Sequence, residues 1–183
     1  MDARAFTPAD VPQLTSLLHR AYAELGDAGL NFTAVDQDDV TTLRRASGGK
    51  TWVVERDGAL AAAMTISWPA EAALQELTPV ADAPGMAWLN QLAVDPERRG
   101  EGLASRLRDI GYAWCVEQGA THIGLDTALP AEHLVRMYTA WGFGQADTVQ
   151  WPGKRYRSIV MTRELPAGGA EQLVRVRPRG AGR

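Results

Sequence analysis

The chain has a single cysteine, Cys115, and only three histidines among its 183 residues. A lone cysteine excludes an internal disulfide and is typical of a protein in a reducing compartment. His19, His122 and His133 lack the spacing of metal ligands, so the sequence predicts no metal site. No apolar run reaches the roughly 18 residues of a membrane-spanning helix, and the N-terminus lacks a signal peptide's basic and apolar regions. These absences predict a cytoplasmic protein without membrane contact.

An excess of charge of one sign is also missing, because the formal net charge is only −3. This balance argues against a protein whose whole surface binds nucleic acid. The hydrophobic share of 45% and charged share of 22% are ordinary for a globular protein. We expect a single domain over residues 1–165, followed by a flexible Gly- and Arg-rich tail over residues 166–183.

The stretch 86–105 (MAWLNQLAVDPERRGEGLAS) combines a strand, a loop and a helix start. Its apolar first part, 86–94, predicts a strand that Pro96 ends, because proline lacks the N–H that a ladder needs. Apolar residues at helical spacing then predict a helix over 102–118. A charged loop with two glycines separates the two elements.

This loop has the features of a phosphate site. The first N–H groups of a helix have no partner inside it, and the helix dipole adds partial positive charge there. Gly100 and Gly102 let the main chain approach an anion closely, and Arg98 and Arg99 add full charges. The sequence therefore predicts a pyrophosphate cradle. A dinucleotide fingerprint is disfavoured, because a charged loop separates the glycines from the strand and Ser105 takes the third position.

The rest of the pattern predicts a mixed α/β domain. The predicted strands cover 3–7, 51–55, 60–68, 86–94, 121–127, 144–151 and 155–163. The predicted helices cover 10–26, 36–46, 102–118 and 130–141, and 69–85 contains a short helix or a flap. Asp57-Gly58 predicts a hairpin turn. The helical crossover predicts that 121–127 runs parallel to 86–94.

Three motifs carry a resemblance to a known family. They are Asn90–Pro96 (NQLAVDP), Arg99–Ala104 (RGEGLA) and Met137–Phe143 (MYTAWGF). The second fits the pattern (Gln/Arg)-x-x-Gly-x-(Gly/Ala) of an acetyl-CoA motif, and the third is similar to an aromatic-rich LYxxxGF ending. With the element order over residues 3–163, these motifs resemble the GNAT superfamily of N-acetyltransferases.

The resemblance implies a GNAT-like α/β fold, with a central, mostly antiparallel sheet flanked by helices. Its parallel pair, 86–94 and 121–127, would form a V-shaped wedge that receives the acetyl thioester of acetyl-CoA. A β-bulge near Leu92-Ala93 is implied, which would leave a free N–H aimed at the thioester carbonyl. The implied pantetheine contacts are Leu92, Ala93 and Val94, and the implied pyrophosphate contacts are Arg99, Gly100, Glu101, Gly102, Leu103 and Ala104.

The resemblance also implies that Tyr138 protonates the departing CoA sulfur, although its neighbours make a core-packing role possible. Two residues depart from the family pattern: Asn90 stands where many members have a glutamate base, and Ala131 where many have an asparagine. An amide cannot accept a proton at neutral pH, so the sequence does not identify the general base. The alternatives are a water held by Asn90 or Gln91, a carboxylate such as Asp126 or Asp36, or an acceptor amine that needs no base.

The implied activity is direct acetyl transfer to a primary amine, with a small-molecule acceptor favoured, by a monomer or a homodimer. The alternative is an acyl-CoA-binding sensor of the same fold without turnover. The acidic run 36–39, with Glu24 and Asp27, predicts helix-start electrostatics or an acidic rim that attracts a cationic amine. Two readings also stay open for Phe32, Trp68 and Trp151, which would form either an apolar acceptor wall or part of the core.

Overall fold

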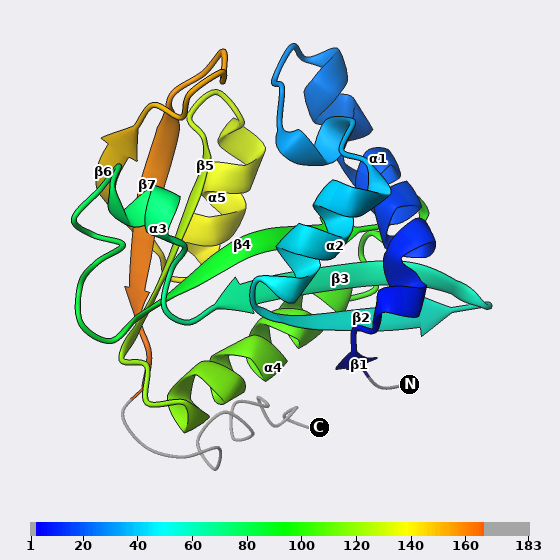
Figure 1. Cartoon of the computed structure of the whole chain (residues 1–183), viewed down its shortest axis with the longest axis horizontal. Helices are drawn as coiled ribbons and strands as arrows, with labels where there is room; N and C mark the ends of the chain where they lie inside the picture. Colours follow the sequence, from blue (N-terminus) through cyan, green and yellow to red (C-terminus); the bar gives the residue numbers. More distant parts are fainter. Residues whose placement is uncertain (1–2, 167–183) are drawn as a thin grey trace, which may run out of the picture.

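The computed structural model describes residues 3–166, which form a seven-stranded mixed sheet flanked by helices (Figure 1). The strands are β1 (Arg4–Ala5), β2 (Lys50–Arg56), β3 (Ala59–Ser67), β4 (Met86–Val94), β5 (His122–Ala128), β6 (Gly144–Val149) and β7 (Ser158–Glu164). The α-helices are α1 (Val11–Asp27), α2 (Asp39–Ser47), α3 (Ala72–Gln75), α4 (Leu103–Glu117) and α5 (Glu132–Ala140). The strand order is β1-β2-β3-β4-β5-β7-β6. The predicted tail lies outside the described residues except for Pro166.

Helices cover both faces of the sheet, and each face has its own apolar core. In Figure 1, α1 and α2 lie in front of β2, β3 and β4, and α4 lies behind them. Leu14 and Leu17 of α1 pack on one face with Val53, whereas Leu107 of α4 packs on the other with Ile66. Strand β3 is buried along nearly its whole length for this reason.

The hairpin between β2 and β3 forms at the predicted turn. Asp57 and Gly58 both have positive φ, at 51° and 81°, as the tight turn between twisted antiparallel strands requires. Helix α2 begins three residues later than predicted. The reason is a cap: Asp38 accepts a hydrogen bond at 2.8 Å from the N–H of Thr41, which fixes the helix start at Asp39.

Strands β4 and β5 form the predicted parallel pair, but only along a short length. Met86, Ala87 and Trp88 pair with His122, Ile123 and Gly124, and beyond these residues the two strands separate. In Figure 1, β4 runs across the molecule while β5 and β7 turn away from it. The expected V-shaped wedge is therefore confirmed, and its apex lies just after Trp88.

A β-bulge interrupts β4, but not at the expected place. Thr65 of β3 lies opposite Gln91, and the next residue, Ile66, lies opposite Leu89, so Asn90 is the extra residue. The expectation of a bulge near Leu92-Ala93 is wrong by two to three residues. A bulge is an extra residue in the pairing of two strands, and its place depends on the register, which no local pattern in 86–94 encodes.

The register still leaves backbone groups of Leu92 facing the wedge. The N–H of Asp95 donates to the carbonyl of Ala61 at 2.8 Å, so Asp95 faces β3. In an antiparallel pair, alternate residues face the same side, so Ala93 also faces β3 and Leu92 and Val94 face away from it. Strand β5 has left by this point, and the N–H of Leu92 is therefore free of the ladder.

No helix in the described part of the chain is both long enough and apolar enough to cross a membrane.

Candidate active site

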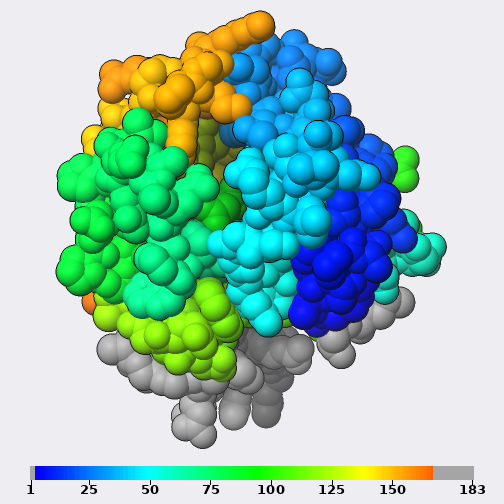
Figure 2. Space-filling model, viewed as in Figure 1, coloured from blue at the N-terminus to red at the C-terminus, as the bar shows by residue number. Residues whose placement is uncertain are grey.

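A cleft of about 1020 Å³ runs through the place where β4 and β5 separate. Residues from α4 and α5 line it on one face of the sheet, and residues from α1, α2 and α3 line it on the other. Figure 2 shows one opening as a hollow between the green segment around α3, the cyan α2 and the orange hairpin above them. We call this opening, lined by Arg45, Trp151 and Lys154, the α2 mouth. The opening lined by Gly100 and Gly102 is the α4 mouth.

The α4 mouth contains most of the predicted pyrophosphate contacts. Gly102 is the N-cap of α4 in the left-handed conformation, with φ of 76°, and Gly100 has φ of 86°. A Cβ added to either glycine would meet no atom within 4 Å, so space for a ligand lies directly against the main chain. The N–H groups of the first turn of α4 have no partner inside the helix. This combination fits an anion held by backbone donors.

Two arginines flank this mouth, and each is already paired with a carboxylate. Arg99 Nη1 lies 2.9 Å from Glu24 Oε2, and Arg98 donates to Asp57. Both pairs are exposed, so solvent screens them and a phosphate can compete for the guanidinium groups. Glu101 does not line the cleft, because its side chain turns toward Arg98 and Arg56.

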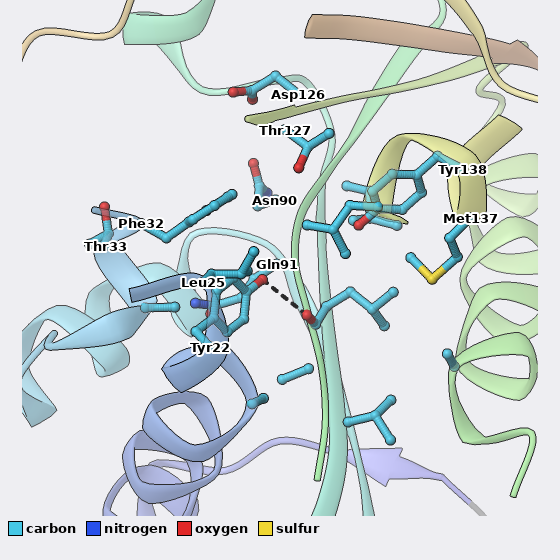
Figure 3. A pocket seen from close by; sticks show the side chains of 18 of the residues that line it. Tyr22, Leu25, Phe32, Thr33, Asn90, Gln91, Asp126, Thr127, Met137 and Tyr138 are labelled. Atoms are coloured by element: carbon cyan, nitrogen blue, oxygen red, sulfur yellow. Dashed lines mark hydrogen bonds between the residues drawn. The ribbon is translucent and has the colours of Figure 1, made fainter. Parts of the chain in front are cut away.

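The wall that β4 provides contains the predicted pantetheine contacts. Leu92, Ala93 and Val94 all line the cleft. The hydroxyl of Tyr22 donates a hydrogen bond at 3.0 Å to the carbonyl of Leu92 (Figure 3). Burial raises the pKa of Tyr22, so this hydroxyl stays protonated and acts as a donor.

Tyr138 lies on the cleft wall opposite α1, in the last turn of α5. In Figure 3, it lies with Met137 across β4 from Tyr22 and Phe32. Its ring also makes edge contacts with Trp141 and Phe143, at centroid distances of 5.8 and 6.0 Å. The side chain is 7% exposed, and this burial raises its pKa well above the usual value. Tyr138 is therefore both a core residue and a protonated hydroxyl at the cleft.

Asp126 and Thr127 of β5 and Asn90 of β4 line the cleft where these two strands separate (Figure 3). The carboxylate of Asp126 accepts a hydrogen bond at 2.8 Å from the indole N–H of Trp151. Burial raises the pKa of Asp126, and the hydrogen bond from Trp151 and the charge of Arg45 oppose this effect only in part. A carboxylate with a raised pKa in a cleft is a candidate proton acceptor.

Of the other carboxylates considered from the sequence, Glu24 lines the cleft and is paired with Arg99, and the rest do not line it. Asp38 caps α2, and Asp39 accepts a hydrogen bond at 2.6 Å from the hydroxyl of Thr15. Asp27 and Asp36 are also absent from the lining. The run 36–39 therefore fits the reading as helix-start electrostatics, and of the residues named for the alternative acidic rim only Glu24 lines the cleft.

The three aromatic residues predicted to form either an acceptor wall or part of the core do not all have the same position. Phe32 and Trp151 line the cleft, whereas Trp68 packs against the apolar core beside α4. Ala131, which stands where many family members have an asparagine, is 2% exposed and packs in a small apolar cluster with Leu25 and Tyr156. Cys115 is fully buried, and burial raises the pKa of its thiol to about 12, as expected for a structural cysteine.

Several residues that line the cleft were not foreseen from the sequence. Tyr22 comes from the apolar stripe of α1, and Arg45, Lys154 and Tyr156 come from segments assigned to a helix end and a hairpin. Their only sequence signal is a polar or aromatic residue at the end of an element. Their convergence depends on the tertiary fold.

Among residues 3–166, no three side chains of His, Cys, Asp or Glu lie close enough to share a metal ion. The expected absence of a metal stays a prediction.

Comparisons with known proteins agree with this architecture. A sequence model described as the acetyltransferase (GNAT) family matches residues 12–143. The structure is similar to that of an acetyltransferase of the GNAT family from Listeria monocytogenes, with 22% identity over 90% of this chain and 94% of that one and a TM-score of 0.69. It is also similar to the ribosomal-protein-S18-alanine N-acetyltransferase from Escherichia coli, with 16% identity over 93% and 97% of the two chains and a TM-score of 0.67. No curated protein matches the chain.

Proposed function

Because the chain belongs to the acetyltransferase (GNAT) family, whose members are acyltransferases, we propose that it transfers an acetyl group from acetyl-CoA to the primary amine of a small molecule. One observation carries this proposal. The unpaired N–H groups at the start of α4 open into the same cleft as the free backbone of Leu92 and the hydroxyl of Tyr138. A phosphate-binding group, a carbonyl-polarising donor and an acid thus share one space.

The α4 mouth is proposed as the donor side. The open space at Gly100 and Gly102 fits the approach of a pyrophosphate to the main chain, and Arg98 and Arg99 supply charge. Leu92 and Val94 point their backbone groups into the wedge, where an extended pantetheine arm can pair with them as an added strand would.

In the proposed reaction, the amine nitrogen attacks the thioester carbonyl carbon. The new C–N bond forms, the C–S bond breaks, and the sulfur leaves with its electron pair as a thiolate. The free N–H of Leu92 faces the wedge and is positioned to stabilise the oxyanion that develops on the carbonyl oxygen.

Tyr138 is proposed to give its proton to the departing thiolate. A tyrosine hydroxyl is protonated at neutral pH, the form that an acid needs, and burial raises its pKa further. Asp126 is proposed to take the proton that the amine loses, directly or through a water. It is the carboxylate in the wedge whose pKa is raised, and it lines the same cleft as Asn90, the residue found in place of a glutamate base.

Calorimetric titration of the full chain with acetyl-CoA tests the donor site, with NADH as the comparison ligand. We expect micromolar affinity for acetyl-CoA and no response to NADH. Thiol release with a panel of amines then tests turnover. Binding of acetyl-CoA without thiol release from any amine would support the sensor alternative, and absence of acetyl-CoA binding would overturn the proposal.

A further inference from the structure

Two cationic side chains at the α2 mouth are not in an ion pair with any carboxylate among residues 3–166. They are Arg45 and Lys154, which line the cleft and are half-buried. The other mouth is different, since Arg98 and Arg99 are both paired there. Arg45 makes only a long contact, 3.4 Å, with the side-chain oxygen of Gln37.

Lys154 is held in place by neutral acceptors. Its ammonium group donates to the carbonyl of Asn31 at 2.7 Å and to the hydroxyl of Thr33 at 3.0 Å, which leaves one N–H without a partner. Burial lowers its pKa, and the charge of Arg45 lowers it further, while the charges of Asp36 and Asp126 oppose this effect. A half-buried cation next to a second cation is stabilised by any anion that binds between them.

The loop that carries Lys154 is fixed across the mouth. The side chain of Asn31 donates to the carbonyl of Gly153 at 2.9 Å and accepts from the N–H of Arg155 at 3.0 Å. The loop after α1 and the loop between β6 and β7 are thereby joined. In Figure 1 these two loops lie at the same end of the molecule. The position of the Lys154 ammonium is thus set before any ligand binds.

These cations do not serve the proposed pyrophosphate site. Arg45 belongs to α2, which covers one face of the sheet, whereas the glycines of the α4 mouth begin the helix that covers the other face. The sheet lies between them, and only the wedge connects the two sides. An anion at Arg45 and Lys154 must therefore enter with the second substrate.

The same part of the cleft also contains the carboxylate of Asp126, which attracts a cationic group. Trp151, whose indole holds this carboxylate, lies three residues before Lys154 in the loop between β6 and β7. Opposite charges thus line the same cleft from different elements: Arg45 on α2, Lys154 on the loop between β6 and β7, and Asp126 on β5. This polarity fits a ligand with an anionic end and an amine end.

We propose that the acceptor is an amine that also carries an anionic group, a carboxylate or a phosphate, which Lys154 and Arg45 bind while the amine lies at Asp126. This inference rests on the proposed acetyl transfer and specifies its second substrate. It differs from the alternative considered from the sequence, in which an acidic rim attracts a cationic amine.

A series of matched ligands that differ in length and in the anionic group tests this inference. The probes are ω-amino acids from glycine to 6-aminohexanoate, ω-aminoalkyl phosphates of the same lengths, and the n-alkylamines that lack the anionic group. Binding to the full chain is measured by calorimetry, with and without saturating CoA, and thiol release is measured with acetyl-CoA. We expect at least one anionic amine to bind about tenfold or more tightly than its matched alkylamine. Comparison of the ω-amino acids with the ω-aminoalkyl phosphates identifies which anionic group the protein binds.

Substitutions assign the effect to the two cations. In Lys154→Met and in Arg45→Met, the advantage of the anionic amine is expected to fall to about twofold or less, while the affinity for acetyl-CoA is unchanged. Arg155→Met is the matched control, because it removes a neighbouring charge on an exposed side chain that does not line the cleft. It is expected to keep the advantage.

The inference is overturned if no anionic amine exceeds its matched alkylamine, or if the advantage survives in the Lys154→Met, Arg45→Met double variant. Failure of acetyl-CoA to bind is a separate result. It would remove the proposed transferase activity, and the ligand series without CoA would still decide whether the α2 mouth selects anionic amines.

Discussion

The hydroxyl of Tyr22 and the carbonyl of Leu92 form a hydrogen bond of 3.0 Å that joins α1 to β4 beside the wedge. It occupies the carbonyl of a residue whose N–H is free of the sheet, so the two backbone groups of Leu92 have separate tasks. The carbonyl anchors the helix that forms one wall of the cleft. The N–H is available to a ligand.

Replacing Tyr22 with phenylalanine leaves the Leu92 carbonyl without this donor in a largely buried site. The free energy of unfolding is expected to fall by about 1 kcal/mol, since a lost hydrogen bond to a buried acceptor costs roughly that amount. Chemical denaturation measures the change. Tyr156→Phe is the control. Tyr156 is also buried and lines the cleft, but its ring packs against that of Phe32 and the substitution keeps this contact. Equal losses in both variants would argue against a specific anchoring role.

Replacing Tyr138 with phenylalanine keeps the ring in its aromatic contacts and removes only the hydroxyl. We expect kcat to fall by about 100-fold, in the range for loss of a general acid, with little change in the affinity for acetyl-CoA. Steady-state kinetics and calorimetry separate the two quantities. Tyr112→Phe removes a hydroxyl from another buried tyrosine, one that does not line the cleft, and is expected to keep kcat. An unchanged kcat in Tyr138→Phe would refute the acid role.

Replacing Gly102 with glutamate places bulk and negative charge where the pyrophosphate is proposed to bind. The affinity for acetyl-CoA is expected to fall by about 100-fold or more, because an anion would lie against the proposed anion site. The matched control is Gly119→Glu at the far end of α4, where φ is also positive, at 90°, and the space is also open. Calorimetry on both variants separates local backbone strain from loss of the cradle. Retained affinity in Gly102→Glu would refute the cradle.

Replacing Asp126 with asparagine tests the proposed base through pH. The active form is the carboxylate, so kcat of the natural sequence is expected to fall as the pH drops through the raised pKa of Asp126. The variant is expected to lose this acidic limb and about 100-fold in kcat. An acidic limb that persists in the variant would assign the titration to another group.

The same substitution has a second consequence for stability. A carboxyl group whose pKa is raised in the folded state binds its proton more tightly there than in the unfolded chain. The contribution of Asp126 to the free energy of unfolding therefore falls as the pH rises above the ordinary value of 3.8. Asp126→Asn removes that fall. Asp147, whose pKa is lowered mainly by a hydrogen bond from Thr78, stabilises above the ordinary value and loses this contribution in acid. Denaturation at several pH values gives the change in the free energy of unfolding that each substitution causes. Plotted against pH, this change is expected to have opposite slopes for Asp126→Asn and Asp147→Asn.

Much of the fold was predictable, because its signals are local. The apolar run 86–94, the turn at Asp57-Gly58 and the glycines before α4 each determine their structure through neighbours in sequence. The bulge at Asn90 was not predictable, since it depends on how two strands align. The position of Lys154 was not predictable either, because it is fixed by Asn31, a residue 123 positions away in the chain.

The two mouths of the cleft have a consequence for the order of events in turnover. One molecule entering beside α4 and another entering beside α2 do not obstruct each other, since they come from opposite faces of the sheet and meet only in the wedge. In the proposed reaction, both substrates would be present together, and the acetylated product would be free to depart while CoA is still bound. Initial-rate plots at several fixed concentrations of one substrate are then expected to give intersecting lines, the pattern of a ternary complex, and not the parallel lines of an enzyme that must release one product before it accepts the next substrate.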